Sequence, residues 1–152
     1  MSQTPTLPEL EGGYSLRPVS KAILPMVLDA YSEDPESAKA ALPWLKNNED
    51  ITRQLADMLH DLEHLSNVDR VHFWSIHNQE NTFIGLIGLG DEMQLVHSHY
   101  NLGYWVRKEF RNQGIASNAV DAVLFWLESR GRVFRVEITV HPRNMAGLIT
   151  CL

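Results

Sequence analysis

A glycine turn between an apolar strand and an apolar helix could bind the phosphates of a nucleotide. Gly114 comes three residues after Arg111 and directly before a helical pattern that begins near Ile115. Glycine lets the backbone approach an anion closely, and the N–H groups that start a helix point at that anion with the positive end of the helix dipole. The pattern therefore predicts a pyrophosphate site, with an acyl-carrying nucleotide as its ligand.

Two commoner phosphate-binding loops have different spacings. A P-loop needs Gly-x4-Gly-Lys-Ser/Thr and a dinucleotide-binding fold needs Gly-x-Gly-x-x-Gly. This chain instead has Arg111-x-x-Gly114-x-Ala116. The spacing therefore argues against nucleoside triphosphates and nicotinamide cofactors.

The same spacing resembles the Arg/Gln-x-x-Gly-x-Gly/Ala acyl-CoA signature of the GNAT superfamily of N-acyltransferases. Residues 102–106 before the turn, and residues 135–138 with Asn144 after it, are similar to that family too. The branch that the chain resembles most is the RimJ/RimL type of protein N-terminal acetyltransferase, and the likeness runs over about residues 14–152. The resemblance implies acetyl-CoA as cosubstrate and no metal.

The resemblance also implies which residues hold the cosubstrate. Backbone groups of Tyr104, Trp105 and Val106 would face the pantetheine arm, and Asn144 would hydrogen-bond the amides of that arm. The residues that would hold the pyrophosphate form one run, to which Arg111 adds positive charge: Arg111, Asn112, Gln113, Gly114, Ile115, Ala116 and Ser117.

The catalytic groups are less clearly marked. An amine attacks a thioester only when it is uncharged, so a proton must be accepted and the departing thiolate protonated. Asn101 stands where the RimJ/RimL-like branch often has a glutamate. His97 and His99 alternate along the strand that leads to the turn, and Glu137 in the next strand could line the groove. The alternatives are a solvent-facing strand end for the histidines and an ion pair for Glu137.

The elements around these residues predict an α+β domain with a GNAT-like mixed, mostly antiparallel sheet flanked by helices. Prolines and the Gly12-Gly13 pair predict a flexible tail over residues 1–13. We expect strands over residues 14–19, 71–76, 82–89, 95–106 and 134–140, the second and third forming a hairpin. We expect helices from about residue 24, over residues 35–42, after an Asn48 cap, and over residues 115–130. In the last helix, Phe125 and Trp126 widen the apolar face, which predicts that both sides are covered.

The family normally adds two strands after the helix that Asn144 would cap. We therefore expect one domain over residues 14–152 that is C-terminally incomplete and lacks the last two strands. Three explanations stay open: a fragment, a homodimer in which a partner chain supplies the strands, or an exposed sheet edge.

Composition and charge limit the kinds of partner that the chain could bind. Of the 152 residues, 44% are hydrophobic and 21% are charged, which is typical of a globular domain. The formal charge of -6 argues against nucleic acid as a partner. The sequence predicts neither a signal peptide nor a membrane segment, so a cytoplasmic location is expected. His60 and His64 have helical metal-pair spacing but fit a hydrated helix face better.

The leading hypothesis is an N-acetyltransferase that moves an acetyl group from acetyl-CoA to a protein N-terminal amine of the ribosomal-protein type, by direct attack in a ternary complex. One alternative acceptor is a small amine, such as a polyamine or an amino-sugar antibiotic. An alternative that is not an enzyme is a non-catalytic remnant of the family that binds CoA or a partner chain.

Overall fold

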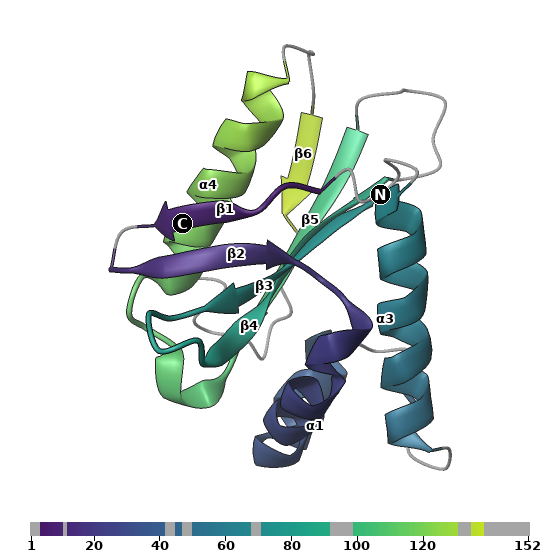
Figure 1. Cartoon of the computed structure of the whole chain (residues 1–152). Coiled ribbons are helices and arrows are strands. Elements are labelled where there is room, and N and C mark those ends of the chain that lie inside the picture. Colours follow the sequence, from purple (N-terminus) through teal and green to yellow (C-terminus); the bar gives the residue numbers. More distant parts are fainter. Residues whose placement is uncertain are drawn as a thin grey trace.

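The computed structural model describes residues 4–10, 12–41, 45–46, 50–67, 71–91, 99–130 and 135–138. These residues form a six-stranded sheet with the strands in chain order and helices on both faces (Figure 1). The strands are β1 Leu7–Leu10, β2 Tyr14–Pro18, β3 His72–His77, β4 Phe83–Asp91, β5 His99–Val106 and β6 Arg135–Ile138. The helices are α1 Leu24–Glu33, α2 Pro35–Ala41, α3 Ile51–Asn67 and α4 Ile115–Ser129, with 3-10 turns η1 Lys21–Ile23 and η2 Lys108–Phe110.

The sheet is mixed, as predicted. The strands β1 to β5 pair antiparallel in sequence, whereas β6 pairs parallel with β5. A parallel pair needs a crossover connection, and α4 lies in the connection between these two strands. The chain leaves the carboxyl end of β5, passes through η2 and the glycine turn, and reaches the N-terminus of α4 at Ile115.

Most predicted elements are confirmed, with boundaries shifted by a few residues. Pro25 lies in the first turn of α1, where the missing N–H of proline has no helical partner to lose. The β3 and β4 strands form the predicted hairpin. The flexible tail predicted over residues 1–13 is wrong for residues 4–10, because Leu7–Leu10 is a strand on β2 and Thr4 is buried. Pro5 and Pro8 in this segment are compatible with an edge strand, because a strand that pairs on one side only needs fewer N–H donors.

The start of α3 also differs from the prediction. The Asp50 carboxylate accepts hydrogen bonds from the backbone N–H groups of Thr52, at 2.9 Å, and Arg53, at 3.4 Å. Asp50 therefore caps the helix at Ile51, and the predicted Asn48 cap is wrong. Several polar residues precede the first apolar position, and the apolar period alone does not distinguish among them.

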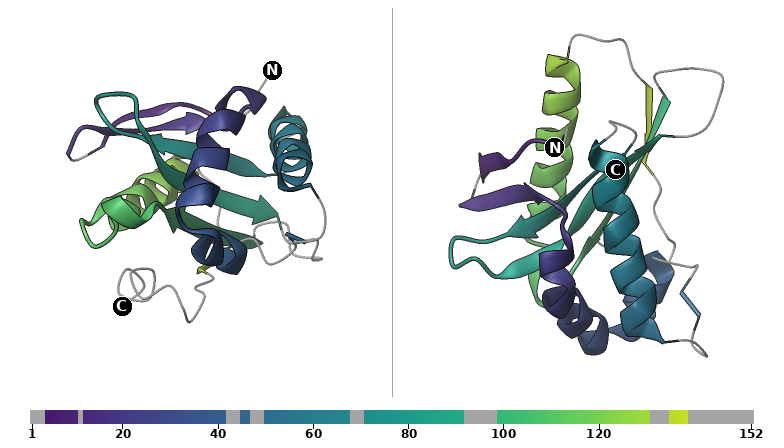
Figure 2. Two further views of the ribbon diagram at one scale, coloured as in Figure 1. Left: turned by 90° about the horizontal axis from the view of Figure 1, so that it is seen from below. Right: turned by 45° about the vertical axis from the view of Figure 1, so that its right-hand side comes forward.

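Two apolar layers hold the helices on the sheet. Figure 2 shows α4 on one face and α1 with α3 on the other. Buried Ala119 and Val123 of α4 pack with Trp74, whereas Leu55 of α3 packs with Phe83 in the second layer. The predicted cover on both sides of α4 is wrong for Phe125, whose side chain is 74% exposed.

Some predictions fall on residues outside those described. They include His97, Asn144 and the C-terminal helix. Among the described helices, none combines the length and the apolar character needed to cross a membrane.

Candidate active site

The described pairing with β6 covers only the first half of β5. The pairing with β6 covers His99 to Leu102, whereas the pairing with β4 continues as far as Val106. In the described part of the chain, residues 103–106 therefore have a strand neighbour on one side only. This opens an edge of backbone groups next to the glycine turn.

The alternation of backbone groups shows which residues face that edge. The N–H of Arg107 donates to the carbonyl oxygen of Ile84 at 2.8 Å and so continues the β4 ladder. Because strand residues alternate in direction, the backbone of Trp105 also faces β4, whereas Tyr104 and Val106 face the opposite side. The carbonyl of Val106 indeed accepts a hydrogen bond from Arg111 Nε at 2.8 Å.

This geometry corrects one predicted contact. The backbone of Trp105 is directed at β4, so it does not face the edge on which a pantetheine arm was expected. The indole of Trp105 is 9% exposed and lies on the α1 and α2 side of the sheet, where its Nε1 donates to Ser37 Oγ at 2.9 Å. Trp105 therefore belongs to the opposite wall of the site.

The glycine turn has the backbone conformation that its residues predict. Gly114 has φ 78° and Asn112 has φ 62°, both in the left-handed region. Glycine adopts this region without strain and asparagine tolerates it better than most residues. A Cβ added at Gly114 would meet no described atom within 4 Å, so backbone conformation is what favours glycine here.

The N-terminus of α4 is left open to an anion. The first intrahelical bond runs from Asn118 N–H to the Gly114 carbonyl at 3.0 Å, so the N–H groups of Ile115, Ala116 and Ser117 have no helical partner. In this described stretch no side chain caps the helix and no acidic residue lies in its first turn. The donors and the helix dipole together fit a phosphate group.

Arg111 makes contacts within the chain that the motif did not indicate. Its guanidinium lies 3.4 Å from a carboxylate oxygen of Asp34 and 2.5 Å from Ser37 Oγ, in addition to its bond to Val106. These contacts occupy the charge that was expected to face the pyrophosphate. Arg111 instead ties the turn to the start of α2, and Gln113 ties it to the Glu109 carbonyl at 3.0 Å.

A second ion pair holds the same corner together. Arg107 pairs with Glu33 at the end of α1 and donates through its Nη1 to the Phe83 carbonyl at 3.1 Å. Glu33 and Asp34 thus neutralise both arginines that flank the turn. The helices α1 and α2 are thereby fixed against the end of β5.

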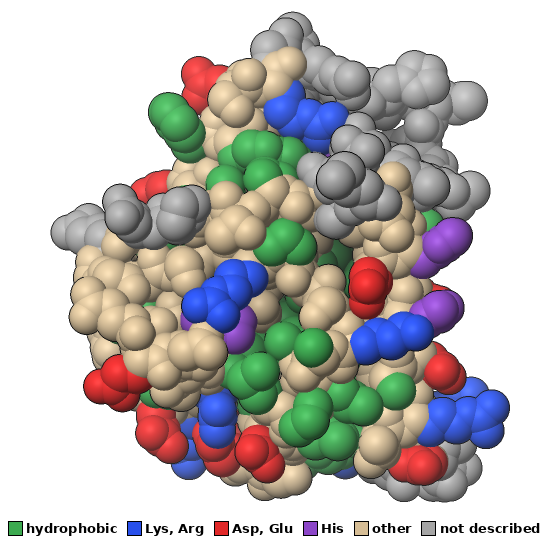
Figure 3. All heavy atoms as spheres, in the orientation of Figure 1, with side chains coloured by type: hydrophobic (Ala, Val, Ile, Leu, Met, Phe, Trp, Pro, Cys, Tyr) green, Lys and Arg blue, Asp and Glu red, His purple; other side chains and the backbone are tan. Residues whose placement is uncertain are grey.

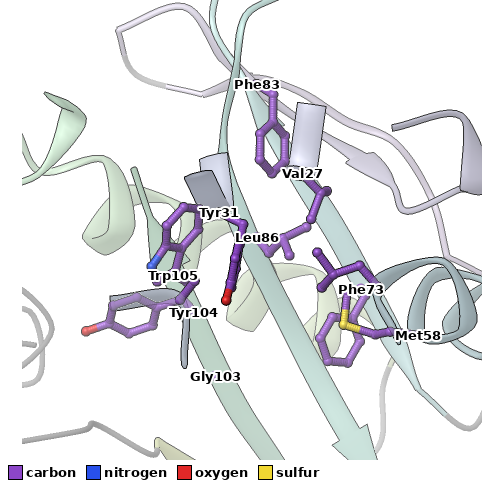
Figure 4. A pocket seen from close by; sticks show the side chains of 11 residues that line it. Val27, Tyr31, Met58, Phe73, Phe83, Leu86, Gly103, Tyr104 and Trp105 are labelled. Atoms are coloured by element: carbon purple, nitrogen blue, oxygen red, sulfur yellow. The ribbon is translucent and has the colours of Figure 1, made fainter. Parts of the chain in front are cut away.

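An apolar cavity of about 290 Å³ lies beside this corner. It is enclosed by α1, α2, α3 and the strands β3 to β5 (Figure 4). Its lining residues are Val27, Tyr31, Ala38, Leu55, Met58, Phe73, Phe83, Leu86, Gly103, Tyr104 and Trp105. The sequence did not indicate that these residues would line one cavity, because they come from six separate elements. The periodicities of the helices and strands marked most of them as core.

The predicted catalytic residues lie on two neighbouring strands. Asn101 of β5 is the register partner of Glu137 of β6, and His99 is the partner of Arg135. These positions lie within the described β5–β6 pairing. Of the described histidines, His60 and His64 are exposed, and the described residues contain no His, Cys, Asp and Glu cluster that could hold a metal.

The left-handed glycine turn and the open helix N-terminus define an α+β domain suited to a nucleotide phosphate, with an apolar cavity beside β5. Comparison with family models is more specific. The model of the acetyltransferase (GNAT) domain matches residues 15–147. The chain therefore belongs to the GNAT acetyltransferase family.

Solved structures of this family share the fold. A RimL ribosomal L7/L12 alpha-N-protein acetyltransferase in complex with coenzyme A superposes with a TM-score of 0.82 at 18% identity, over 96% of this chain and 80% of that one. RimJ of Mycobacterium smegmatis in complex with CoA-disulfide gives 0.78 at 20% identity, over 97% and 73%. The ribosomal-protein-S5-alanine acetyltransferase of Vibrio fischeri gives 0.74 at 16% identity, over 93% and 78%. No curated protein matches the sequence significantly.

Proposed function

We propose that this chain is an acyl-CoA-dependent N-acetyltransferase that acetylates the N-terminal amine of a protein. The observation that carries the proposal is the uncapped N-terminus of α4, which follows the left-handed Gly114 in the connection after β5. The RimL and RimJ structures with coenzyme A support this assignment. Their names also support a ribosomal protein as the acceptor.

The residues present fit the cosubstrate. The N–H groups of residues 114–117 would hold the pyrophosphate, with Asn112 and Gln113 shaping the turn. Backbone groups of Tyr104 and Val106 would face the pantetheine arm, and Asn144 remains the proposed partner of its amides. Arg111 would act as a positioning residue, because its guanidinium is held by Asp34 and Ser37. Acetyl-CoA, when bound, supplies a thioester carbonyl that an uncharged amine can attack.

The proton of the amine has two proposed acceptors. His99 and Glu137 carry groups that can accept a proton near neutral pH, whereas the amide of Asn101 can orient an amine but cannot act as its base. Asn101 and Glu137 are register partners on the neighbouring strands β5 and β6. We therefore propose Asn101 for orientation and either Glu137 or His99, acting through water, for the proton.

Charge favours an amine acceptor. The net charge of -6 would attract a protonated amine from solution and would disfavour nucleic acid. A ribosomal-protein acceptor would place the reaction in the cytoplasm.

The test is an acceptor screen with acetyl-CoA, read by mass spectrometry of the product and by release of the free CoA thiol. The acceptors are N-terminal peptides of ribosomal proteins, spermidine and an aminoglycoside. Each peptide has an Nα-blocked copy that keeps its lysines as the control. Acetylation of the free peptides alone is expected. Saturable binding of CoA without turnover of any amine would instead support a non-catalytic remnant.

A further inference from the structure

We infer that the apolar cavity binds the side chain of the residue that carries the acceptor amine. The chain would then prefer N-termini that begin with a large, uncharged apolar residue such as Leu, Met or Phe. This inference rests on the proposed function and adds the substrate class.

The lining of the cavity is apolar, and part of it belongs to the packed core. Leu55 and Phe83 are almost fully buried, at 1% and 2% exposure, and they belong to the packed layer between α3 and the sheet. Figure 4 shows Tyr31 and Trp105 on one side of the space and Met58 on the other. Hydrophobic side chains also gather over α1 on the face seen in Figure 3. Binding of an apolar side chain to such a surface is favourable, because it removes apolar atoms from water.

The volume is large enough for a bulky side chain. Sites for drug-sized ligands have volumes of about 300–1,000 Å³, so the cavity of about 290 Å³ lies at the lower end. A seryl or alanyl side chain would leave most of the space unfilled. A leucyl, methionyl or phenylalanyl side chain would make many more contacts with the walls.

The charges exclude a cationic occupant. None of the described lining residues is charged. The nearest arginines on the turn side are paired, Arg107 with Glu33 and Arg111 with Asp34. A charged side chain would therefore lose its hydration without gaining a partner. This argues against polyamines and amino sugars as occupants of the cavity.

The cavity is next to the place where the amine would react. It is lined by Gly103, Tyr104 and Trp105, which are the residues of β5 just beyond the end of the β6 pairing. Gly103 is exposed, and a Cβ added there would meet no described atom within 4 Å. Gly103 thus belongs both to the lining of the cavity and to the strand that the cosubstrate would follow. An amine at this strand could place its own side chain in the cavity.

The test uses peptides that differ only in their first residue: Ser, Ala, Leu, Met, Phe and Lys. We expect kcat/KM for the Leu, Met and Phe peptides to exceed that for the Ala peptide by about tenfold to a hundredfold, as apolar pockets discriminate by size. Gly103→Leu would fill part of the cavity, so it should lower the ratio of the Leu to the Ala peptide about tenfold. Gly103→Ala, which adds one methyl group, is the matched control and should keep more of that ratio.

A binding measurement separates the cavity from catalysis. Calorimetry compares the N-acetyl-leucyl and N-acetyl-alanyl peptides, which are products and need no cosubstrate. The leucyl product should bind about tenfold more tightly, and Gly103→Leu should remove the difference. Equal binding and equal kcat/KM, or a preference for Ser or Ala, would overturn the inference and leave the proposed function standing. Failure of every peptide in both experiments would overturn the proposed function as well.

Discussion

The two sides of β5 are built in different ways. On the cosubstrate side, the groups that would bind a ligand are backbone N–H groups from one continuous stretch, residues 112–117. On the acceptor side, the walls are side chains that run from Val27 in α1 to Trp105 in β5. A backbone site needs few specific side chains, whereas a side-chain cavity depends on how several elements pack. Substitutions on the acceptor side should therefore change mainly the stability of the chain, whereas substitutions on the cosubstrate side should change mainly its affinity for the cosubstrate.

The largest effect is expected on the acceptor side. Phe83 is 2% exposed and packs in the layer under α1 and α3, so Phe83→Ala should lower the free energy of unfolding by about 3–5 kcal/mol. Urea denaturation measures the loss, and Phe83→Leu is the milder control. The folded variant should bind CoA with nearly unchanged affinity. A loss of CoA affinity as large as the loss of stability would show that the two sides are not independent.

Ser37 joins the two sides, and its loss should affect both. Its hydroxyl oxygen accepts hydrogen bonds from Trp105 Nε1 at 2.9 Å and from Arg111 at 2.5 Å. Ser37→Ala leaves both partly buried donors without this acceptor, which should cost about 1–3 kcal/mol of stability. It should also weaken CoA binding, because Arg111 holds the turn. Ser37→Thr keeps the hydroxyl and is the control, and an unchanged Ser37→Ala protein would contradict the proposed link.

The cosubstrate side should lose affinity without losing stability. Ser117 lies in the first turn of α4. A carboxylate at this position interacts favourably with the helix dipole and stabilises the helix by about 0.3–1 kcal/mol. Ser117→Glu should therefore fold at least as stably as the natural chain. It should bind CoA about tenfold more weakly, or about 1.4 kcal/mol, because it places a negative charge at the phosphate site. Ser117→Gln has the same shape without the charge, and equal affinities for the two variants would place the phosphates elsewhere.

A smaller effect should follow pH through His77 of β3, whose ring contacts Phe83 edge-to-face and which does not belong to the cosubstrate side. Burial lowers the pKa of this imidazole below its usual value of 6.5, and the positive charge of Arg17 lowers the pKa further. As pH falls below about 6.5, the unfolded chain takes up a proton before the folded chain does, so stability decreases. Above 6.5 both states are neutral and this group adds no pH dependence.

The measurement for His77 compares the natural chain with His77→Gln in urea denaturation between pH 7.5 and pH 5. The decrease in stability on acidification should be smaller in the variant, and CoA affinity should not follow this difference. Parallel stability curves for the two proteins would contradict the account of His77.

The sequence predicted best what depends on local chemistry. Gly114 and the apolar period after Ile115 indicated the left-handed turn and the start of α4, because both features are properties of consecutive residues. Alternating apolar residues indicated the β3 and β4 hairpin for the same reason. The edge strand β1 was not predicted, because prolines are typical of loops. An edge strand tolerates them, since it pairs with a neighbour on one side only.

The features that sequence could not show depend on contacts between distant segments. The motif suggested a free charge on Arg111, but Asp34 and Ser37, more than 70 positions away, hold that charge in the structure. The pairing of the backbone of Trp105 with β4, rather than with a ligand, is set by strand register. The apolar cavity forms only where α1, α2 and α3 pack against the sheet. None of these contacts has a local periodicity.

The central claim is that backbone N–H groups of residues 114–117 and the outer edge of β5 bind the cosubstrate. A titration of the isotope-labelled chain with CoA, followed by proton–nitrogen correlation NMR, tests it most directly. The amide signals of Gly114, Ile115, Ala116 and Ser117 should shift most, together with those of Tyr104 and Val106, while the amide of Trp105 shifts less. Binding that shifts other amides instead, or no saturable binding by the folded chain, would contradict the claim.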